Sequence, residues 1–273
     1  MTYHKKIEHL GVLALDKQLN GNLYQNTANF YDFDNRDIIK DDLEFYSDYA
    51  KQAKGKILEL ASGTGRVSLY IADKIKKPIE CVELSAKMLE RFNEKLNTTH
   101  GYLKQYINIH NNDMSNFNLE QKFDLIIIPW RALQWLPVQE KTIECLKCVY
   151  NHLADNGVFI FDIFRPRIYD EKWLNKEDVS YDITDGNRRI IRSTVNYYAD
   201  TEKKYIQYKN KIRIIESGIE SINEDLLTIK YYEYSDITGI LDNLNFSIKE
   251  EYGYYDKRNI DDGDEMIFTC VKK

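Results

Sequence analysis

The chain has 273 residues, of which 43% are hydrophobic and 30% are charged, and its formal net charge at pH 7 is −6. The apolar content excludes an intrinsically disordered chain, and the length allows one or two domains with large cores. The acidic balance argues against a broad nucleic-acid interface, which needs a basic face.

The N-terminal residues 1–18 carry only a five-residue apolar run after two lysines, which is too short for a signal peptide. No stretch approaches the roughly 18 consecutive apolar residues of a membrane span. We therefore expect a cytoplasmic protein without a membrane segment. The single CxxC motif, at Cys145 and Cys148, has no second pair, so we expect no bound metal.

Two segments make up the first part of the chain: a polar, helical segment at 1–54 and an α/β core at 55–177. In the first segment one helix face is predicted from Leu43, Tyr46, Tyr49 and Ala50. In the core, apolar runs typical of buried parallel strands alternate with helix-period stretches. The expected strands are 56–60, 79–83, 106–109, 123–128 and 158–163, and the expected helices are 64–76, 86–96 and 138–153. This alternation predicts a mostly parallel sheet with helices on both faces, whose ligands bind beyond the carboxyl ends of the strands.

The second part of the chain begins with period-two alternation, which predicts an antiparallel β-meander inserted at 178–234. One of its faces is apolar (Ile206, Tyr208, Ile212 and Ile214) and the other is wet (Gln207, Lys209, Lys211 and Arg213). The final segment, 235–273, begins with a helix capped by a serine in "SDITGILDNLN". Two last core strands are expected at 246–253 and 265–271.

The turn after the first strand, in "GKILELASGTGRVSLYIADK", predicts a ligand site. Glu59 is an acid within an apolar strand, where an unpaired carboxylate is costly, and at the strand end it would point into the ligand crevice. Gly63 and Gly65 let the backbone turn tightly and approach a ligand closely. Arg66 opposes the dipole of the next helix, and a bound anion would relieve that conflict. A ligand with a cationic group near Glu59 and an anionic group near Arg66 would be an amino-acid zwitterion. The alternative is a βα turn whose charges are solvated.

Acids near two further strand ends suggest a nucleoside. Glu83 ends the second strand, where a carboxylate can accept hydrogen bonds from a ribose diol, although acids often end strands. Asp113 follows the third strand and could accept a hydrogen bond from the exocyclic amine of adenine, and Met114 could lie against the purine. The alternative role for Asp113 is an Asx turn. A dinucleotide fits less well, because Ser68 stands where the fingerprint needs its third glycine. A zwitterion joined to a nucleoside describes S-adenosylmethionine.

The motifs "ILELASGTGR", "CVELSAKML", "NNDMSNF" and "FDLIIIPWRALQWL" resemble those of class I S-adenosylmethionine-dependent methyltransferases, and the resemblance covers about residues 24–273. It implies a Rossmann-like α/β fold with a mostly parallel seven-stranded sheet and an inserted antiparallel meander. The tail "LLTIKYYEYSDITGILDNLNFSIKEEYGYYD" is similar to that of small-molecule members of this architecture, whose relatives include antibiotic-sugar N-methyltransferases and glycine N-methyltransferase.

Carried over to this sequence, the resemblance implies a cofactor site and a methyl-transfer site. The methionine half would lie along the turn that contains Glu59, Ala61, Ser62, Gly63, Gly65 and Arg66. The ribose would bind Glu83, and the remaining cofactor contacts would be Leu84, Met88, Asp113, Met114 and Pro129. Tyr24 and Tyr31 would cover the cofactor as part of a lid, and the residues assigned to catalysis are Tyr31, Trp130 and Arg131. Ala61 and Ser62 depart from the glycine and cysteine common in relatives, but both are small.

Methyl transfer from a sulfonium is an in-line displacement that needs alignment and exclusion of water. We expect the acceptor to be an N or O atom of a small molecule, and no histidine matches a catalytic motif. The expected substrate wall consists of Tyr31, Trp130, Arg131, Gln134, Arg165, Tyr254 and Tyr255. The alternatives are a methyltransferase acting on RNA or protein, and a non-catalytic binding protein. A homodimer through the inserted sheet is a further expectation.

Overall fold

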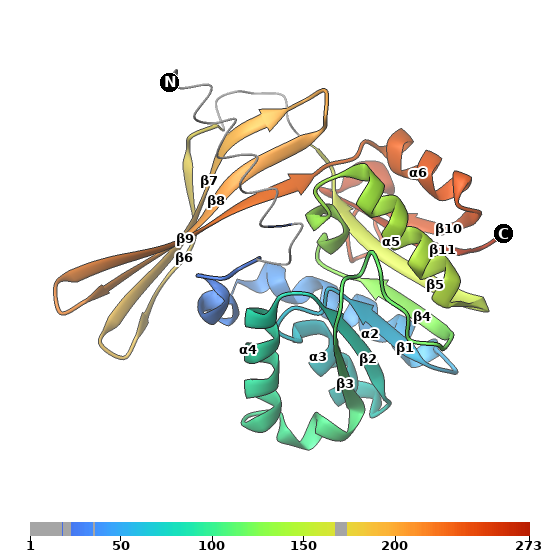
Figure 1. Ribbon diagram of the computed structural model, residues 1–273, viewed down its shortest axis with the longest axis horizontal. Coiled ribbons are helices and arrows are strands. Elements are labelled where there is room, and N and C mark those ends of the chain that lie inside the picture. Colours follow the sequence, from blue (N-terminus) through green and yellow to red (C-terminus); the bar gives the residue numbers. More distant parts are fainter. Residues whose placement is uncertain (1–17, 19–22, 35, 167–173) are drawn as a thin grey trace.

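A mixed seven-stranded sheet forms the core of the computed structural model, which describes residues 18, 23–34, 36–166 and 174–273 (Figure 1). Its strands lie in the order β10-β11-β5-β4-β1-β2-β3. Strands β1 to β5 run parallel, whereas β11 is antiparallel to both of its neighbours, β5 and β10. The strand bounds are Ile57–Leu60 (β1), Ile79–Glu83 (β2), Ile107–Asn111 (β3), Phe123–Ile128 (β4), Leu153–Phe164 (β5), Phe246–Tyr252 (β10) and Glu265–Lys272 (β11). This confirms the expected Rossmann-like α/β fold.

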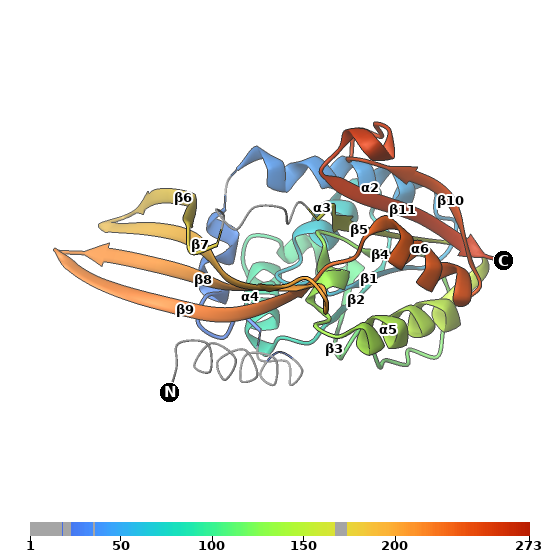
Figure 2. The same cartoon turned by 90° about the horizontal axis from the view of Figure 1, so that it is seen from above.

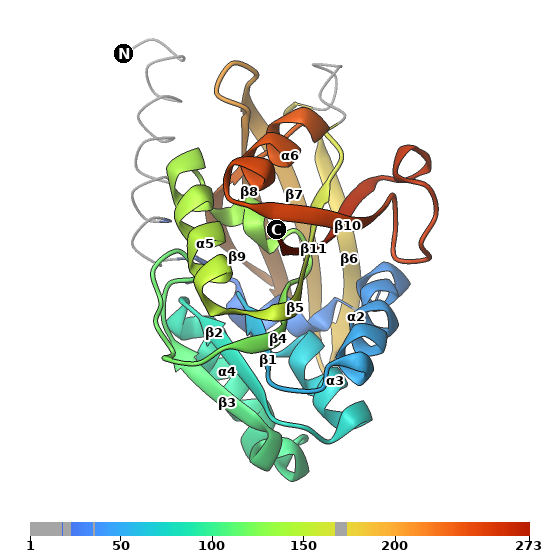
Figure 3. The ribbon, with the colours of Figure 1, turned by 90° about the vertical axis from the view of Figure 1, so that its right-hand side faces the viewer.

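Helices cover both faces of the sheet, which explains why its central strands are mostly apolar on both faces; Glu59 in β1 and Asp162 in β5 are buried acids among them. The α-helices are α2 (Asp41–Gln52), α3 (Arg66–Ile75), α4 (Ala86–Asn97), α5 (Gln139–His152) and α6 (Tyr234–Asn243). Figure 3 shows α2 and α3 on one side of the sheet and α5 and α6 on the other. Short 3₁₀ helices connect these elements: η1 (Ala28–Phe33), η2 (Asp37–Lys40), η3 (Gly101–Tyr106), η4 (Ala132–Trp135) and η6 (Ile260–Asp262).

The cap of α6 differs from the prediction. The helix begins at Tyr234, and its N-cap is Glu233 rather than Ser235. Glu233 and Asp236 form a capping box, in which the Asp236 carboxylate accepts from the backbone N–H of Glu233 at 2.9 Å. This reciprocal pair satisfies two helix-end donors, so the serine is not needed as the cap.

The inserted segment folds as a second, antiparallel sheet in the order β6-β7-β8-β9, and it extends away from the core (Figure 2). Its strands are β6 (Glu177–Asp185), β7 (Arg188–Asp200), β8 (Tyr205–Glu216) and β9 (Ile219–Lys230). Gln207 was expected on the wet face but is buried, and its amide donates to the Thr228 hydroxyl. On the free edge of β9, the Gln18 side chain bonds both the N–H and the C=O of Thr228.

The division of the chain into segments at 54, 177 and 234 stays a prediction. Among the residues that the structure describes, no helix is long and apolar enough to cross a membrane.

We predict that Gly65→Ala lowers the free energy of unfolding by about 2–4 kcal/mol, because the new methyl group meets both backbone strain and a steric clash. Gly65 precedes α3 with φ = +79°, and a Cβ there would lie 2.2 Å from the ring of Phe92, which is buried in α4. The measurement is urea unfolding at equilibrium.

The matched control is Gly239→Ala within α6, where a Cβ would meet nothing within 4 Å. It should raise the free energy of unfolding by about 0.5–1 kcal/mol through helix propensity. If Gly65→Ala proved as harmless as this control, Phe92 would not fix the glycine.

Candidate functional site

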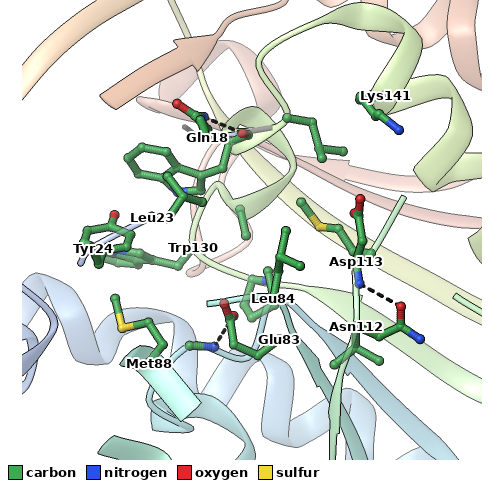
Figure 4. Close-up of a pocket in the computed structure, with 18 of the residues that line it drawn as sticks. Gln18, Leu23, Tyr24, Glu83, Leu84, Met88, Asn112, Asp113, Trp130 and Lys141 are labelled. Atoms are coloured by element: carbon green, nitrogen blue, oxygen red, sulfur yellow. Dashed lines mark hydrogen bonds between the residues drawn. The ribbon is translucent and has the colours of Figure 1, made fainter. Parts of the chain in front are cut away.

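Two cavities lie beyond the carboxyl ends of the parallel strands, where the strand order reverses between β1 and β4. The first cavity is lined mainly by the segments that follow β1, β2, β3 and β4 (Figure 4). The second cavity has a volume of about 470 Å³ and also draws on β6, β7, β8 and β9. Four aromatic residues line both cavities and so mark where they meet: Tyr24, Tyr31, Trp130 and Trp135.

Glu83 ties two turns together at the first cavity. One carboxylate oxygen accepts from the backbone N–H of Gly63 at 2.8 Å, and the other accepts from that of Ser85 at 2.7 Å. Burial raises the pKa of Glu83, and the backbone hydrogen bonds oppose that rise. Each oxygen keeps a further lone pair, so the carboxylate can still accept from a ligand hydroxyl.

The glycine turn faces the first cavity through Gly63, whereas Gly65 serves packing. Gly63 has φ = +57°, and a Cβ there would enter open space. Gly65 lies against Phe92 and lines neither cavity, so its expected role in close ligand approach is not what fixes it as glycine. Ala61 lines the first cavity with φ = +54°, a left-handed conformation that costs an alanine about 1–2 kcal/mol.

Glu59 lies beneath this turn instead of pointing into a cavity. Its side chain is on the sheet face covered by α3, and the residue is only 1% exposed. Burial raises its pKa to about 8, although Ser68 and Arg66 favour the charged form. Its Oε2 atom has no hydrogen-bond partner among the described residues. Its contact with a cofactor stays a prediction.

The anion expected beside Arg66 is supplied by the protein itself. The guanidinium makes two hydrogen bonds of 2.6 Å to the carboxylate of Asp42, which is fully buried in α2. Its carbon atom also lies 5.0 Å from the centre of the Trp130 ring. Arg66 therefore lines the second cavity with its charge already matched.

The segment after β3 places Asp113 and Met114 in the first cavity, which Glu83 and Trp130 also line. The Asx turn is present as well, because Asp113 Oδ1 accepts from the backbone N–H of Ser115 at 2.7 Å. The other carboxylate oxygen takes no part in that turn.

Asp162 in β5 holds the backbone of the turn after β4. Its Oδ1 accepts from Trp130 N at 2.8 Å and from the Tyr46 hydroxyl at 2.5 Å, and its Oδ2 accepts from Arg131 N at 2.6 Å. Both turn residues are left-handed, with φ = +58° at Trp130 and +61° at Arg131. Burial raises the pKa of Asp162 to about 6, and the hydrogen bond from Tyr46 opposes that rise. Two successive non-glycine residues with positive φ need such support, because each costs about 1–2 kcal/mol.

Arg131 lines the second cavity and is held by Glu265 in β11. Its Nε lies 3.0 Å from both carboxylate oxygens, and its Nη2 completes the pair. Burial raises the pKa of Glu265 to about 7, and the charge of Arg131 opposes that rise. Like that of Arg66, the guanidinium of Arg131 lies near the Trp130 ring, with its carbon atom 5.7 Å from the ring centre.

The N-terminal segment covers the meeting point of the cavities and is bonded to both parts of the protein. Tyr24 packs edge-on against Tyr31 and Trp135, with ring centres 5.6 and 5.7 Å apart. The Thr27 hydroxyl donates to Asp225 of β9 at 2.5 Å. On the core side, the carbonyl of Leu23 accepts from the Ser85 hydroxyl at 2.8 Å.

Most of the predicted site residues lie together. Those that line the first cavity are Tyr24, Tyr31, Ala61, Gly63, Glu83, Leu84, Met88, Asp113, Met114, Pro129 and Trp130. Arg66 and Arg131 line the second cavity, while Glu59, Ser62 and Gly65 line neither.

Four residues of the expected substrate wall lie outside both cavities. Gln134 is buried and bonds the backbone of Lys230 and Phe164. Arg165, Tyr254 and Tyr255 pack against the loop between β10 and β11 or against α2. The residues that take their place, none of them predicted, come from the N-terminal segment and the second sheet: Asp32, Asp34, Arg36, Asp178, Arg192 and Tyr208. Asp162 was also missed, although an acid inside "VFIFDIF" is the same signal as Glu59.

Within the described residues, no group of three or more His, Cys, Asp or Glu side chains is arranged to hold a metal ion.

Residues 57–157 match the family model described as "Methyltransferase domain". A putative methyltransferase of Bacillus subtilis, YqeM, is 27% identical over 141 residues, which are 52% of this chain; the chain spans about half of that relative's length, 55%. Among solved structures, an S-adenosylmethionine-dependent methyltransferase of Clostridium acetobutylicum superposes with a TM-score of 0.68, 20% identity and 99% coverage of both chains. CalS10, an amino pentose methyltransferase of Micromonospora echinaspora solved with S-adenosylmethionine bound, gives 0.66 at 14% identity, covering 85% of this chain and 91% of its own.

We predict that Asp162→Asn lowers the free energy of unfolding by about 2–4 kcal/mol, because the amide can accept with only one oxygen and leaves a buried N–H of the turn unpaired. Tyr46→Phe is the control, since it removes one donor to Asp162 but leaves both turn bonds, and it should cost about 1 kcal/mol. Equal losses in the two variants, measured by urea unfolding, would show that the carboxylate does not hold the turn.

The raised pKa values of the buried acids predict a pH dependence of stability. From about pH 4.5, the ordinary value for Glu59, to about 8, its value in the folded protein, the folded state binds more protons than the unfolded state. The free energy of unfolding should therefore fall by a few kcal/mol (order of magnitude) between pH 5.5 and 8.5. Glu59→Gln, which cannot ionise, should flatten the profile measured by urea unfolding at each pH. An unchanged slope would assign the dependence to other groups.

Proposed function

We propose that this chain, whose residues 57–157 form a methyltransferase domain in a class I methyltransferase fold, transfers a methyl group from S-adenosylmethionine to a nitrogen or oxygen atom of a small molecule. The observation that carries the proposal is the pair of cavities that meet at Tyr24, Tyr31, Trp130 and Trp135. One cavity suits a nucleoside and the other suits an acceptor, so the methyl group would pass between them.

The residues of the first cavity fit S-adenosylmethionine, which supplies an electrophilic methyl group on a sulfonium. Glu83 offers its remaining lone pairs to the ribose diol, in a position fixed by two backbone amides. Met88 and Met114 offer apolar surface to the adenine, and Asp113 has an oxygen outside its Asx turn. Gly63 leaves room beside the turn that a side chain would fill.

The residues at the junction orient the reactants and exclude water. Trp130 is fixed by its backbone bond to Asp162 and by the two guanidinium groups beside its ring. Tyr24 and Tyr31 close the junction from the N-terminal side. Tyr31, Trp130 and Arg131 therefore keep their proposed place at the site of transfer. No histidine among the described residues lines either cavity. A neutral amine needs no general base, whereas an acceptor that arrives protonated would need one of the carboxylates or tyrosines that line the cavities.

A small acceptor fits the second cavity, whose volume of about 470 Å³ is typical of small-molecule sites. CalS10 is an amino pentose methyltransferase, which agrees with an acceptor of this size. A nucleic-acid acceptor has less support. Of the arginines of "RRIIR", Arg188 pairs with Asp185 and Arg189 pairs with Asp182, while Arg192 lines the second cavity. The cytoplasmic location and a homodimer through the second sheet stay predictions.

Calorimetric titration with S-adenosylmethionine, S-adenosylhomocysteine and NAD tests the proposal. We expect binding of the first two only, and Glu83→Gln should weaken that binding about tenfold, the equivalent of about 1.4 kcal/mol. Gly63→Arg should abolish it by filling the first cavity. The control is Gly186→Arg in the β6–β7 turn, where φ is +62° and the space is also open, so it carries the same backbone strain away from the cavities.

Binding of NAD alone would overturn the assignment of the cofactor. Binding of S-adenosylhomocysteine without turnover in a broad acceptor screen would favour the non-catalytic alternative.

A further inference from the structure

Four arginines line the second cavity, and two of them already have carboxylate partners of their own. Arg66 is neutralised by Asp42, and Arg131 is paired with Glu265. Arg36 and Arg192 are different, because both pair with the same acid, Asp34.

Asp34 lies between these two guanidiniums. Its Oδ1 accepts from Arg36 Nε at 2.9 Å, and its Oδ2 accepts from Arg36 Nη2 at 2.7 Å and from Arg192 Nη1 at 3.3 Å. Burial would raise the pKa of Asp34, but the hydrogen bonds and charge of Arg36 outweigh it, so the pKa is lowered and the group is ionised. Two cations therefore share one anion, which leaves one positive charge in excess at this wall.

A side chain of the neighbouring strand β8 holds Arg192 in place. Its Nε donates to Asn210 Oδ1 at 3.1 Å, and Asn210 donates in turn to the Thr27 hydroxyl at 2.9 Å. Its side chain is only 15% exposed. With the described residues, neither Nη2 of Arg192 nor Nη1 of Arg36 makes a hydrogen bond, so each can donate to a ligand. A guanidinium held in place in this way loses little entropy on binding a planar or tetrahedral oxyanion.

The other two acids of the cavity do not cancel this charge locally. Asp32 is paired with Lys95 at 3.0 Å. Asp178 is exposed and forms no ion pair with the described residues; its charge still raises the pKa of Arg36, but solvent weakens this effect.

We propose that the acceptor carries an oxyanion, a carboxylate or a phosphate, and that Arg36 and Arg192 bind it in the second cavity. This inference rests on the proposed function. The guanidinium of Arg192 lies 5.8 Å from the centre of the Tyr31 ring, and Tyr31 lines both cavities. The oxyanion thus binds one aromatic ring away from the methyl-transfer point, so it belongs to the same small molecule as the acceptor atom. The competing explanation is structural: the two arginines only tie the N-terminal segment to the second sheet.

The test uses the full chain saturated with S-adenosylhomocysteine and measures the melting temperature during titration with sodium phosphate, sodium acetate or sodium chloride at constant ionic strength. We expect a saturable rise with phosphate or acetate that chloride does not give, and the more effective anion identifies the class of oxyanion. Arg192→Met and Arg36→Met should each raise the half-saturating concentration at least fivefold. Asp178→Asn, which removes an opposing charge without breaking an ion pair among the described residues, should lower it about twofold.

Arg189→Met is the matched control, because Arg189 is also an arginine of β7 paired with a carboxylate, Asp182, but lines neither cavity. Its titration should equal that of the unaltered chain. The proposal is overturned if neither anion gives a saturable rise, or if Arg192→Met and Arg189→Met respond alike. Should Arg192→Met not fold, the half-saturating anion concentrations of Arg36→Met and Asp178→Asn still test the proposal. Calorimetry with S-adenosylhomocysteine on the same samples separates failure of the oxyanion proposal from failure of the proposed function. In the first case S-adenosylhomocysteine still binds, and in the second it does not.

Discussion

The carboxylate of Asp162 accepts three hydrogen bonds at the floor of the site, and the positions of Trp130 and α2 both depend on them. The contacts form a closed ring. Asp162 bonds the backbone of Trp130, the Trp130 ring lies against Arg66, and Arg66 pairs with Asp42 of α2. One helical turn along α2, the Tyr46 hydroxyl bonds Asp162 again. Because each residue of this ring contacts two others, a shift of one residue disturbs the contacts of its neighbours.

This ring stands between the first and the second cavity. Trp130 lines both cavities, so its orientation is common to both. The left-handed backbone at Trp130 and Arg131 stores a conformational cost that the carboxylate offsets. The result is a junction whose geometry is set by buried charge on β5 and α2.

The fold and the residues that line the first cavity were predictable because their signals are local in sequence. The alternation of apolar runs predicts the parallel strands, and Gly63 and Glu83 each stand at the end of such a run. The second cavity was not predictable, because its ion pairs join residues distant in sequence. Arg192 and Asp34, for example, are 158 residues apart and meet only when the second sheet folds over the N-terminal segment. Gly65 shows the same limit, since nothing near it in the sequence points to Phe92.

The two cavities are built from different parts of the chain, and this separation bears on how the protein can change. Residues 57–157 supply most of the first cavity, whereas strands β6 to β9 and the N-terminal segment supply most of the second. Substitutions on the second sheet can therefore reshape the second cavity while the lining of the first cavity stays as it is. Divergence within such a scaffold can proceed by exchange of one sheet, so grafting β6 to β9 between related proteins would exchange one cavity wall and keep the other.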